Sequence, residues 1–118
     1  MKNTVLFSCS GASDVGALTD QVARKLTRDG KGQMLCMTAV GTGVKKVLHS
    51  ASKAEKILAI DGCPHQCASK TLKAANFSDI KQIVLSDLNL RKGETELNDQ
   101  NMQQVINTAT TLLQETPA

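Results

Sequence analysis

The sequence predicts an α/β fold in which a mostly parallel four-stranded sheet lies between two layers of helices. Short apolar runs alternate along the chain with longer segments whose apolar residues recur every three or four positions. Strands and helices that alternate at this pitch connect through right-handed crossovers and build a parallel sheet covered on both faces. We therefore expect a single-domain three-layer sandwich over residues 1–118, Rossmann- or flavodoxin-like, with strand order 2-1-3-4.

The first strand and the first helix are expected near the start of the chain. Thr4–Ser8 is a short apolar run that ends at Cys9 and predicts a buried strand followed by a turn. Ser13 or Asp14 is suited to cap the helix that follows. Apolar residues at helical spacing predict that this helix spans 14–28 and ends at Asp29-Gly30.

The next segment contains a weaker strand and a second helix. Residues 32–37, with modest apolar content, predict a short second strand. Ala39–Gly43 is expected to be a glycine-bearing loop, and Val44–Ala51 a helical segment. Lys56–Ile60 then predicts a buried third strand.

The remaining elements follow the same alternation. A third helix is expected from Pro64 to about Asn76, and a fourth strand around Ile80–Leu85. The stretch Leu88–Leu97 fits either a short edge strand or an ordered loop. Asn98 or Asp99 is expected to cap a last helix that stops before Pro117, with an apolar face made by Met102, Val105, Ile106, Ala109, Leu112 and Leu113.

Composition excludes several classes of function. Aromatic residues make up 2% of the chain, so the stacking platforms of single-strand nucleic-acid binders are missing. The net charge of +3 comes from scattered lysines without a basic tract, which also argues against nucleic-acid binding. Val5–Phe7 is too short for a signal-peptide core, and no apolar run approaches the ~20 residues of a membrane span. We expect a cytoplasmic protein, in which cysteines are more often ligands or redox groups than disulfides.

Two of the four cysteines lie in the segment Asp61–Cys67, directly after the third strand. A proline after Cys63 suits the first position of a helix, because proline there gives up only an amide that would be unpaired. The sequence therefore places Cys63 at a helix N-cap and Cys67 one turn further along. Residues four apart on a helix share a face, so both sulfurs are expected to point at one spot.

All four cysteines are expected at one edge of the sheet. Cys9 ends the first strand, Cys36 lies near the end of the second, and Cys63 follows the third. In a parallel sheet of order 2-1-3 these strand ends are neighbours, with adjacent strands ~4.8 Å apart. Cys67 joins them from the third helix. This carboxyl edge is also the topological switch point where α/β sheets bind ligands.

Four converging thiolates suit one Zn²⁺ ion and would also fit an iron–sulfur cluster. A closed four-sulfur site leaves no coordination position for an activated water, so we expect metal handling, sensing or partner binding without dedicated catalysis. Asp61 and His65 are candidates to support the ligands from a second shell. A protein partner or a homo-oligomer remains compatible with the sequence.

Two other interpretations of the cysteines stay open. In the first, the protein is a thiol oxidoreductase or sulfurtransferase, with Cys63 as the nucleophile and Cys67 or Cys9 as the resolving thiol. In the second, the cysteines only pack, as free cysteines often do, and the domain works by binding a partner. The Gly41-Thr42-Gly43 fragment, without a Walker lysine, is too short to indicate a phosphate site.

The sequence resembles the DGC-domain family of small α/β proteins. The resemblance is carried by Cys9-Ser10-Gly11 after the first strand, Cys36 after the second, and Asp61-Gly62-Cys63-Pro64-His65-Gln66-Cys67 after the third. In that family four cysteines are the proposed zinc ligands. The resemblance implies that Cys9, Cys36, Cys63 and Cys67 hold the metal in this chain.

Overall fold

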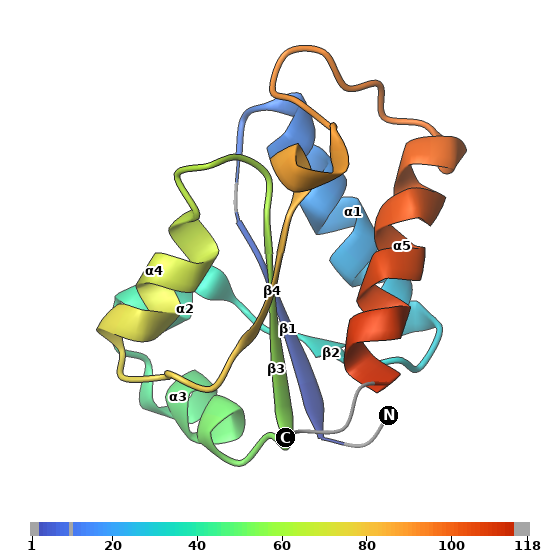
Figure 1. Ribbon diagram of the computed structural model, residues 1–118. Helices are drawn as coiled ribbons and strands as arrows, with labels where there is room; N and C mark the ends of the chain where they lie inside the picture. The colour runs from blue at the N-terminus through green and yellow to red at the C-terminus, as the bar shows by residue number, and fades with distance from the viewer. Residues whose placement is uncertain (1–2, 10, 115–118) are drawn as a thin grey trace.

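The computed structural model describes residues 3–9 and 11–114 (Figure 1). Its centre is a four-stranded parallel sheet in the order β2-β1-β3-β4. The strands are β1 (Thr4–Ser8), β2 (Gln33–Met34), β3 (Lys56–Asp61) and β4 (Lys81–Val84). The predicted α/β class and the predicted strand order are both confirmed.

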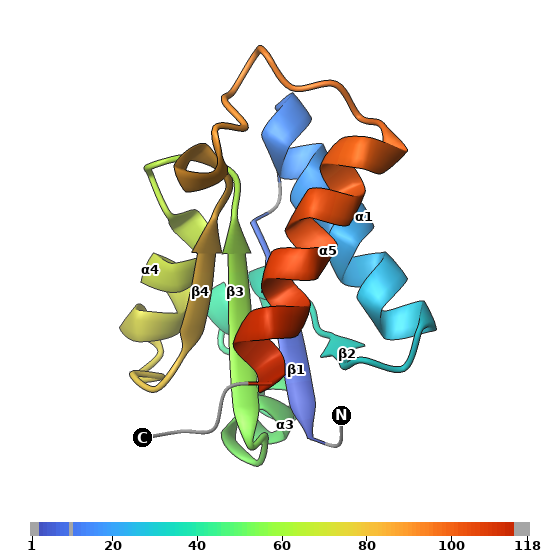
Figure 2. The same cartoon turned by 45° about the vertical axis from the view of Figure 1, so that its right-hand side comes forward.

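Helices cover both faces of the sheet (Figures 1 and 2). One face carries α1 (Asp14–Arg28) and α5 (Asp99–Gln114); the other carries α2 (Met37–Gly41), α3 (Lys45–Ser52) and α4 (Cys67–Ala74). Alternate side chains of a strand point to opposite faces. Leu6 of β1 therefore packs in the core under α1 and α5, whereas Val5 and Phe7 pack in the core under α2 to α4.

Helix α1 begins and ends where the sequence predicts. Ser13 is the N-cap, and its Oγ accepts a hydrogen bond of 3.0 Å from the backbone N–H of Gly16. Asp14 lies in the first turn, where the helix dipole favours a negative charge. The helix stops at Arg28, and Gly30 takes a left-handed φ of 75° just beyond it. Ser10 lies outside the described residues.

The second strand is shorter than predicted. β2 covers only two residues, and the last ladder bond runs from the N–H of Leu35 to the carbonyl of Leu6 at 3.0 Å. The segment 39–43, expected as a loop, is largely helical, because Met37–Gly41 forms α2. Val40 of this helix is buried in the core that α4 also covers. Burial of this valine favours a helical turn where the two glycines suggested a loop.

The third helix begins three residues later than predicted. α4 starts at Cys67, not at Pro64, and ends at Ala74. Gln66, its N-cap, has a left-handed φ of 55°, which interrupts any helix running through Pro64 and His65. The preference of proline for a helix start is outweighed here by the hydrogen bonds that the Asp61 carboxylate accepts from the N–H groups of Ala68 and Ser69.

The last part of the chain contains a loop, not an edge strand. β4 ends at Val84, and the short 3₁₀ helix η1 (Leu85–Leu88) follows it. The residues from Asn89 to Asn98 form no strand. The Oδ1 of Asn98 accepts a hydrogen bond from the N–H of Asn101 at 2.8 Å and so caps α5. The predicted stop at Pro117 lies outside the described residues.

No helix within 3–9 and 11–114 has both the length and the apolar character needed to cross a membrane.

Candidate functional site

A hollow of about 400 Å³ lies at the carboxyl edge of the sheet, and three cysteines line it. Cys9 comes directly after β1, Cys63 follows β3, and Cys67 is the first residue of α4. His65 and Lys92 lie on its rim. We call this site the cysteine hollow. Three of the four cysteines that the sequence places at this edge therefore share one site.

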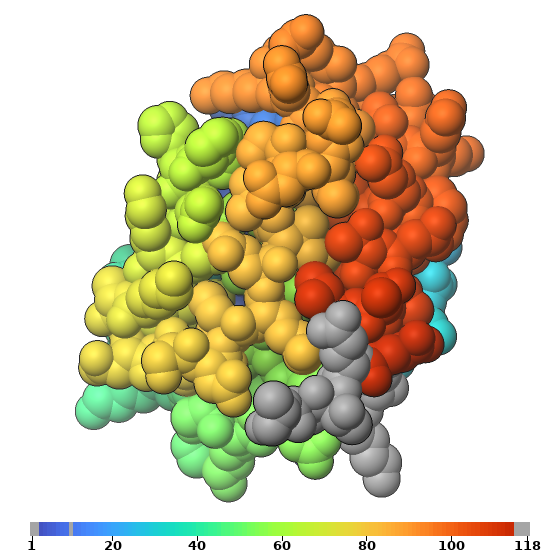
Figure 3. All heavy atoms as spheres, viewed as in Figure 1, coloured from blue at the N-terminus to red at the C-terminus, as the bar shows by residue number. Residues whose placement is uncertain are grey.

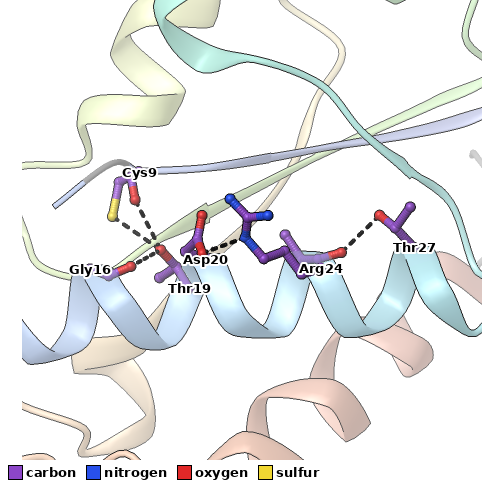
Figure 4. Close-up of polar contacts among 7 residues, drawn as sticks. Cys9, Gly16, Thr19, Asp20, Arg24 and Thr27 are labelled. Atoms are coloured by element: carbon purple, nitrogen blue, oxygen red, sulfur yellow. Dashed lines mark hydrogen bonds and ion pairs between the residues drawn. The ribbon is translucent and has the colours of Figure 1, made fainter.

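Cys9 is the most constrained of the three thiols. Its Sγ accepts a hydrogen bond from the backbone N–H of Gly62 at 3.2 Å. The Oγ1 of Thr19 on α1 lies 3.5 Å from the same sulfur (Figure 4) and can accept from the thiol or donate to the thiolate. Thr19 Oγ1 also donates to the carbonyls of Gly16 at 2.7 Å and Cys9 at 3.0 Å. These contacts hold the sulfur between the start of α1 and the end of β3.

Burial raises the pKa of the Cys9 thiol above its ordinary value. The hydrogen bonds from Thr19 and Gly62 lower the pKa, but only in part, and negative charge on Asp61 and Cys63 adds to the increase. Cys9 is therefore a protonated thiol at neutral pH unless a positive charge enters the hollow.

Gly62 allows the segment between β3 and α4 to pack tightly against α1. A Cβ at this position would lie 3.0 Å from the carbonyl carbon of Val15, so no other residue fits without a shift of backbone. The N–H of Gln66 donates to the carbonyl of Cys63 at 3.1 Å, which closes a turn before α4. Cys63 is therefore not the helix N-cap, and the predicted shared helical face of Cys63 and Cys67 is wrong. Cys63 reaches the hollow from this turn, and Cys67 reaches it from the first residue of α4.

Asp61 holds the start of α4 in place. The residue is fully buried, and its carboxylate accepts hydrogen bonds from the N–H of Ala68 (2.7 Å), the N–H of Ser69 (3.3 Å), the Oγ of Ser69 (2.6 Å) and the Nε2 of Gln82 (3.3 Å). The N–H groups of Ala68 and Ser69 belong to the first turn of α4. The Asp61 carboxylate therefore caps this helix in place of the side chain of the N-cap residue itself. Asp61 thus supports the segment that carries Cys63 and Cys67.

Gln82 is a site residue that the sequence interpretation missed. Its Nε2 also donates to the Oε1 of Gln66 at 3.0 Å, so one side chain from β4 contacts both Asp61 and the left-handed N-cap. The available signal was a polar residue next to the apolar pair Ile83-Val84 in a predicted strand. Nothing in the local pattern indicates that Gln82 reaches across to the cysteine segment.

Cys36 does not line the cysteine hollow. It is exposed, it is the N-cap of α2, and it lines a different hollow of about 610 Å³ beside Arg24 and Arg28 of α1. Figure 4 shows the polar side of α1 in this region, with the Asp20–Arg24 ion pair between Thr19 and Thr27. Because β2 stops after two residues, the chain turns into α2 before it reaches the cysteine hollow.

The positions of the side chains do not fit a preformed four-cysteine metal centre. Within the described part of the chain, no group of three or more His, Cys, Asp or Glu side chains is placed to hold one metal ion. The cysteine hollow brings Cys9, Cys63 and Cys67 to one place without closing them around a common point. Coordination of one ion by these thiols requires side-chain or turn movements from the described conformation.

Comparison with known proteins identifies the family. The chain matches the model of the DGC domain over residues 5–109, a span that contains all four cysteines and the Asp61-Gly62-Cys63 tripeptide. The protein belongs to the DGC-domain family. Among curated relatives, it is 32% identical over 88 residues to the anaerobic and virulence modulator AnvM of Pseudomonas aeruginosa, which is 75% of this chain and 67% of that protein. No solved structure matches this DGC domain. The resemblance noted in the sequence is confirmed.

Proposed function

We propose that this DGC-domain protein binds one thiophilic metal ion, zinc, through the cysteine hollow. The observation that carries the proposal is that Cys9, Cys63 and Cys67, from three separate segments, line one hollow at the switch point of the sheet. Thiolate sulfur is a preferred ligand of Zn²⁺, and such ligands are bound in the deprotonated form. The role we propose is metal handling, sensing or partner binding.

The proposal assigns the ion to three thiols and leaves Cys36 outside. Cys36 lines the other hollow, beside Arg24 and Arg28. Three protein ligands leave one position of a tetrahedral ion for water or an exogenous ligand. A site of this kind suits exchange or sensing better than a purely structural role. A sensing role is also compatible with the similarity to AnvM, which is named an anaerobic and virulence modulator.

Metal analysis of anaerobically purified protein tests this proposal. We expect about one zinc per chain in the wild type and loss of that zinc in Cys63→Ser, because removal of one of three ligands opens the site. Cys36→Ser is the matched control and should keep its zinc. A metal-free wild type with all four thiols reduced would contradict the proposal. Iron in place of zinc would keep the ligands and change the metal.

A second candidate is a thiol oxidoreductase or sulfurtransferase, favoured by the presence of Cys9, Cys63 and Cys67 in the lining of one hollow. In the redox form, the Cys63 thiolate attacks a substrate disulfide and releases one thiol of that substrate. A second thiol, from Cys9 or Cys67, then attacks the mixed disulfide and releases the other substrate thiol. The substrate is reduced, and the protein keeps the internal disulfide. A reversible disulfide at Cys63 in a metal-free protein would favour this candidate.

A further inference from the structure

We propose that the cysteine hollow takes anionic small molecules, and that Lys92 is the residue that selects them by charge. The inference deepens the proposed function, because it names the class of ligand for the same hollow. It depends on the loop formed by residues 91–97, here called the 91–97 loop. Figures 1 and 2 show this part of the chain passing over the start of α1 on its way to α5.

Asp14 holds the 91–97 loop against the start of α1 through hydrogen bonds. Its Oδ1 accepts hydrogen bonds from the N–H of Gly93 at 2.9 Å and of Val15 at 2.8 Å, and its Oδ2 accepts one from the N–H of Thr95 at 2.9 Å. The hydrogen bonds from Gly93 and Thr95 lower the pKa of Asp14 below its ordinary value. The carboxylate is therefore charged at neutral pH and accepts these hydrogen bonds from the loop.

Contacts inside the 91–97 loop fix its shape. The Oγ1 of Thr95, a buried residue, donates to the carbonyl of Arg91 at 2.7 Å, and the N–H of Glu94 donates to the same carbonyl at 3.0 Å. Gly93 takes a left-handed φ of 84°, which a residue with a side chain rarely adopts. With Arg91, Gly93 and Thr95 held, Lys92 has a defined position on the rim of the cysteine hollow.

Lys92 is the cation that the loop brings to this rim. The 91–97 loop carries Arg91, Lys92, Glu94 and Glu96, and Lys92 alone among them lines the hollow. Neither of the two ion pairs found in the described part of the chain includes Lys92. Figure 3 shows atoms of the loop region beside those of the segment before α4 at the same end of the molecule.

Lys92 is the exposed charged side chain among the described residues that line the hollow. Asp61 also lines it, and its negative charge acts on Cys9, but its buried carboxylate oxygens accept hydrogen bonds from Ala68, Ser69 and Gln82, so a molecule that enters from solvent meets the charge of Lys92 first. His65 is an exposed imidazole on the rim and adds no negative charge. A cation at the mouth of a hollow with low-dielectric walls raises the local concentration of anions and speeds their arrival. A small anion is therefore the ligand that this site favours.

The test compares two alkylating reagents that differ in charge and little in size. Iodoacetate is an anion and iodoacetamide is neutral; in both reactions a thiolate sulfur displaces iodide and forms a carbon–sulfur bond. The ratio of the two rate constants at Cys63 and Cys67 is measured by peptide mass spectrometry on the full chain, reduced and treated with a chelator. Because both reagents need the same thiolate, the ratio reports the charge around the sulfur and not its pKa.

We expect Lys92→Gln to lower the iodoacetate-to-iodoacetamide ratio by about threefold at low salt, and the effect to shrink as salt screens the charge. Arg91→Gln is the matched control: it removes the same charge from the same loop, away from the hollow, and should leave the ratio unchanged.

An unchanged ratio in Lys92→Gln, or an equal decrease in Arg91→Gln, would overturn the inference. Zinc content is measured separately on the same wild-type preparation. A protein that holds no zinc yet shows the Lys92-dependent ratio would refute the metal proposal and support the charge selection. A protein that holds zinc but whose ratio does not depend on Lys92 would support the metal proposal and refute the charge selection.

Discussion

The backbone N–H of Gly62 donates a hydrogen bond of 3.2 Å to the Sγ of Cys9 and so joins the segment after β3 to the thiol after β1. The contact depends on the glycine, because Gly62 lies against the backbone of Val15 with no room for a Cβ. It also brings the turn that carries Cys63 next to the Cys9 sulfur. The close packing of three segments, more than any single helix, forms the cysteine hollow.

Gly62→Ala should destabilise the protein. The added Cβ would lie 3.0 Å from both the carbonyl carbon and the Cγ2 of Val15, so the backbone of α1 or of the turn must shift slightly to accept it. Overpacking of this kind costs about 1–3 kcal/mol of the free energy of unfolding, measured by urea denaturation. Gly41→Ala is the control, because its Cβ would meet only Thr71 Cγ2 at 3.6 Å. Equal losses in the two variants would contradict the close packing at Gly62.

Gln82→Ala should loosen the segment that carries Cys63 and Cys67. The substitution removes the hydrogen bonds from Nε2 to Gln66 Oε1 and to the buried Asp61 carboxylate. We expect a loss of about 1–2 kcal/mol in the free energy of unfolding, with faster amide hydrogen exchange at the start of α4.

Gln103→Ala is the control for Gln82→Ala, since it removes only an exposed side-chain hydrogen bond to Asn107. It should change both measurements little. If hydrogen exchange at the start of α4 is the same in the two variants, Gln82 does not position this segment.

Asp14 should make stability depend on pH in the acid range. Its pKa in the folded protein lies below the ordinary value of 3.8, so its hydrogen bonds stabilise the fold fully at higher pH. That contribution is lost as the pH falls through the lowered pKa, because the unfolded chain binds the proton more readily. The stability difference between wild type and Asp14→Asn should therefore be largest near neutral pH and shrink below pH 3.8.

The measurement for Asp14 is chemical denaturation of both proteins across this pH range. Asp20→Asn is the control, because Asp20 is paired only with the exposed Arg24. A stability difference between wild type and Asp14→Asn that grows on acidification would contradict the assignment.

Cys36→Ser should leave the three-thiol group intact. Phenylarsine oxide bridges neighbouring thiols, forming two arsenic–sulfur bonds with release of one water and no change of oxidation state. Because Cys36 lines a separate hollow, we expect the variant to bind the arsenical as the wild type does, measured by intact-protein mass. Cys63→Ser should bind it more weakly. Loss of binding in Cys36→Ser would place Cys36 with the other thiols.

Much of the fold follows from the sequence because burial imposes periodic patterns. The runs Thr4–Ser8 and Lys56–Ile60 reflect strands that are buried on both faces of the sheet, and the helical spacing in 14–28 reflects a helix that packs on one face. The structure confirms these three elements. The strand order follows from right-handed crossovers, which depend on element order and not on particular side chains.

The details of the site depend on contacts that no local pattern records. The start of α4 is set by Asp61 and by Gln82 from another strand, so the proline at position 64 gave a wrong helix start. β2 ends after two residues, which separates Cys36 from the cysteine hollow. The position of Lys92 depends on the hydrogen bonds that the N–H groups of Gly93 and Thr95 donate to Asp14, about eighty residues earlier in the chain.

Anaerobic titration with Co²⁺ tests the central claim most directly, because thiolate-to-cobalt charge-transfer absorption grows with the number of sulfur ligands. The account predicts one tetrahedral Co²⁺ per chain, with charge-transfer absorption that weakens in Cys9→Ser, Cys63→Ser and Cys67→Ser and stays unchanged in Cys36→Ser. Wild-type protein that binds Co²⁺ without charge-transfer absorption, or whose absorption does not respond to Cys9, Cys63 or Cys67, would contradict it.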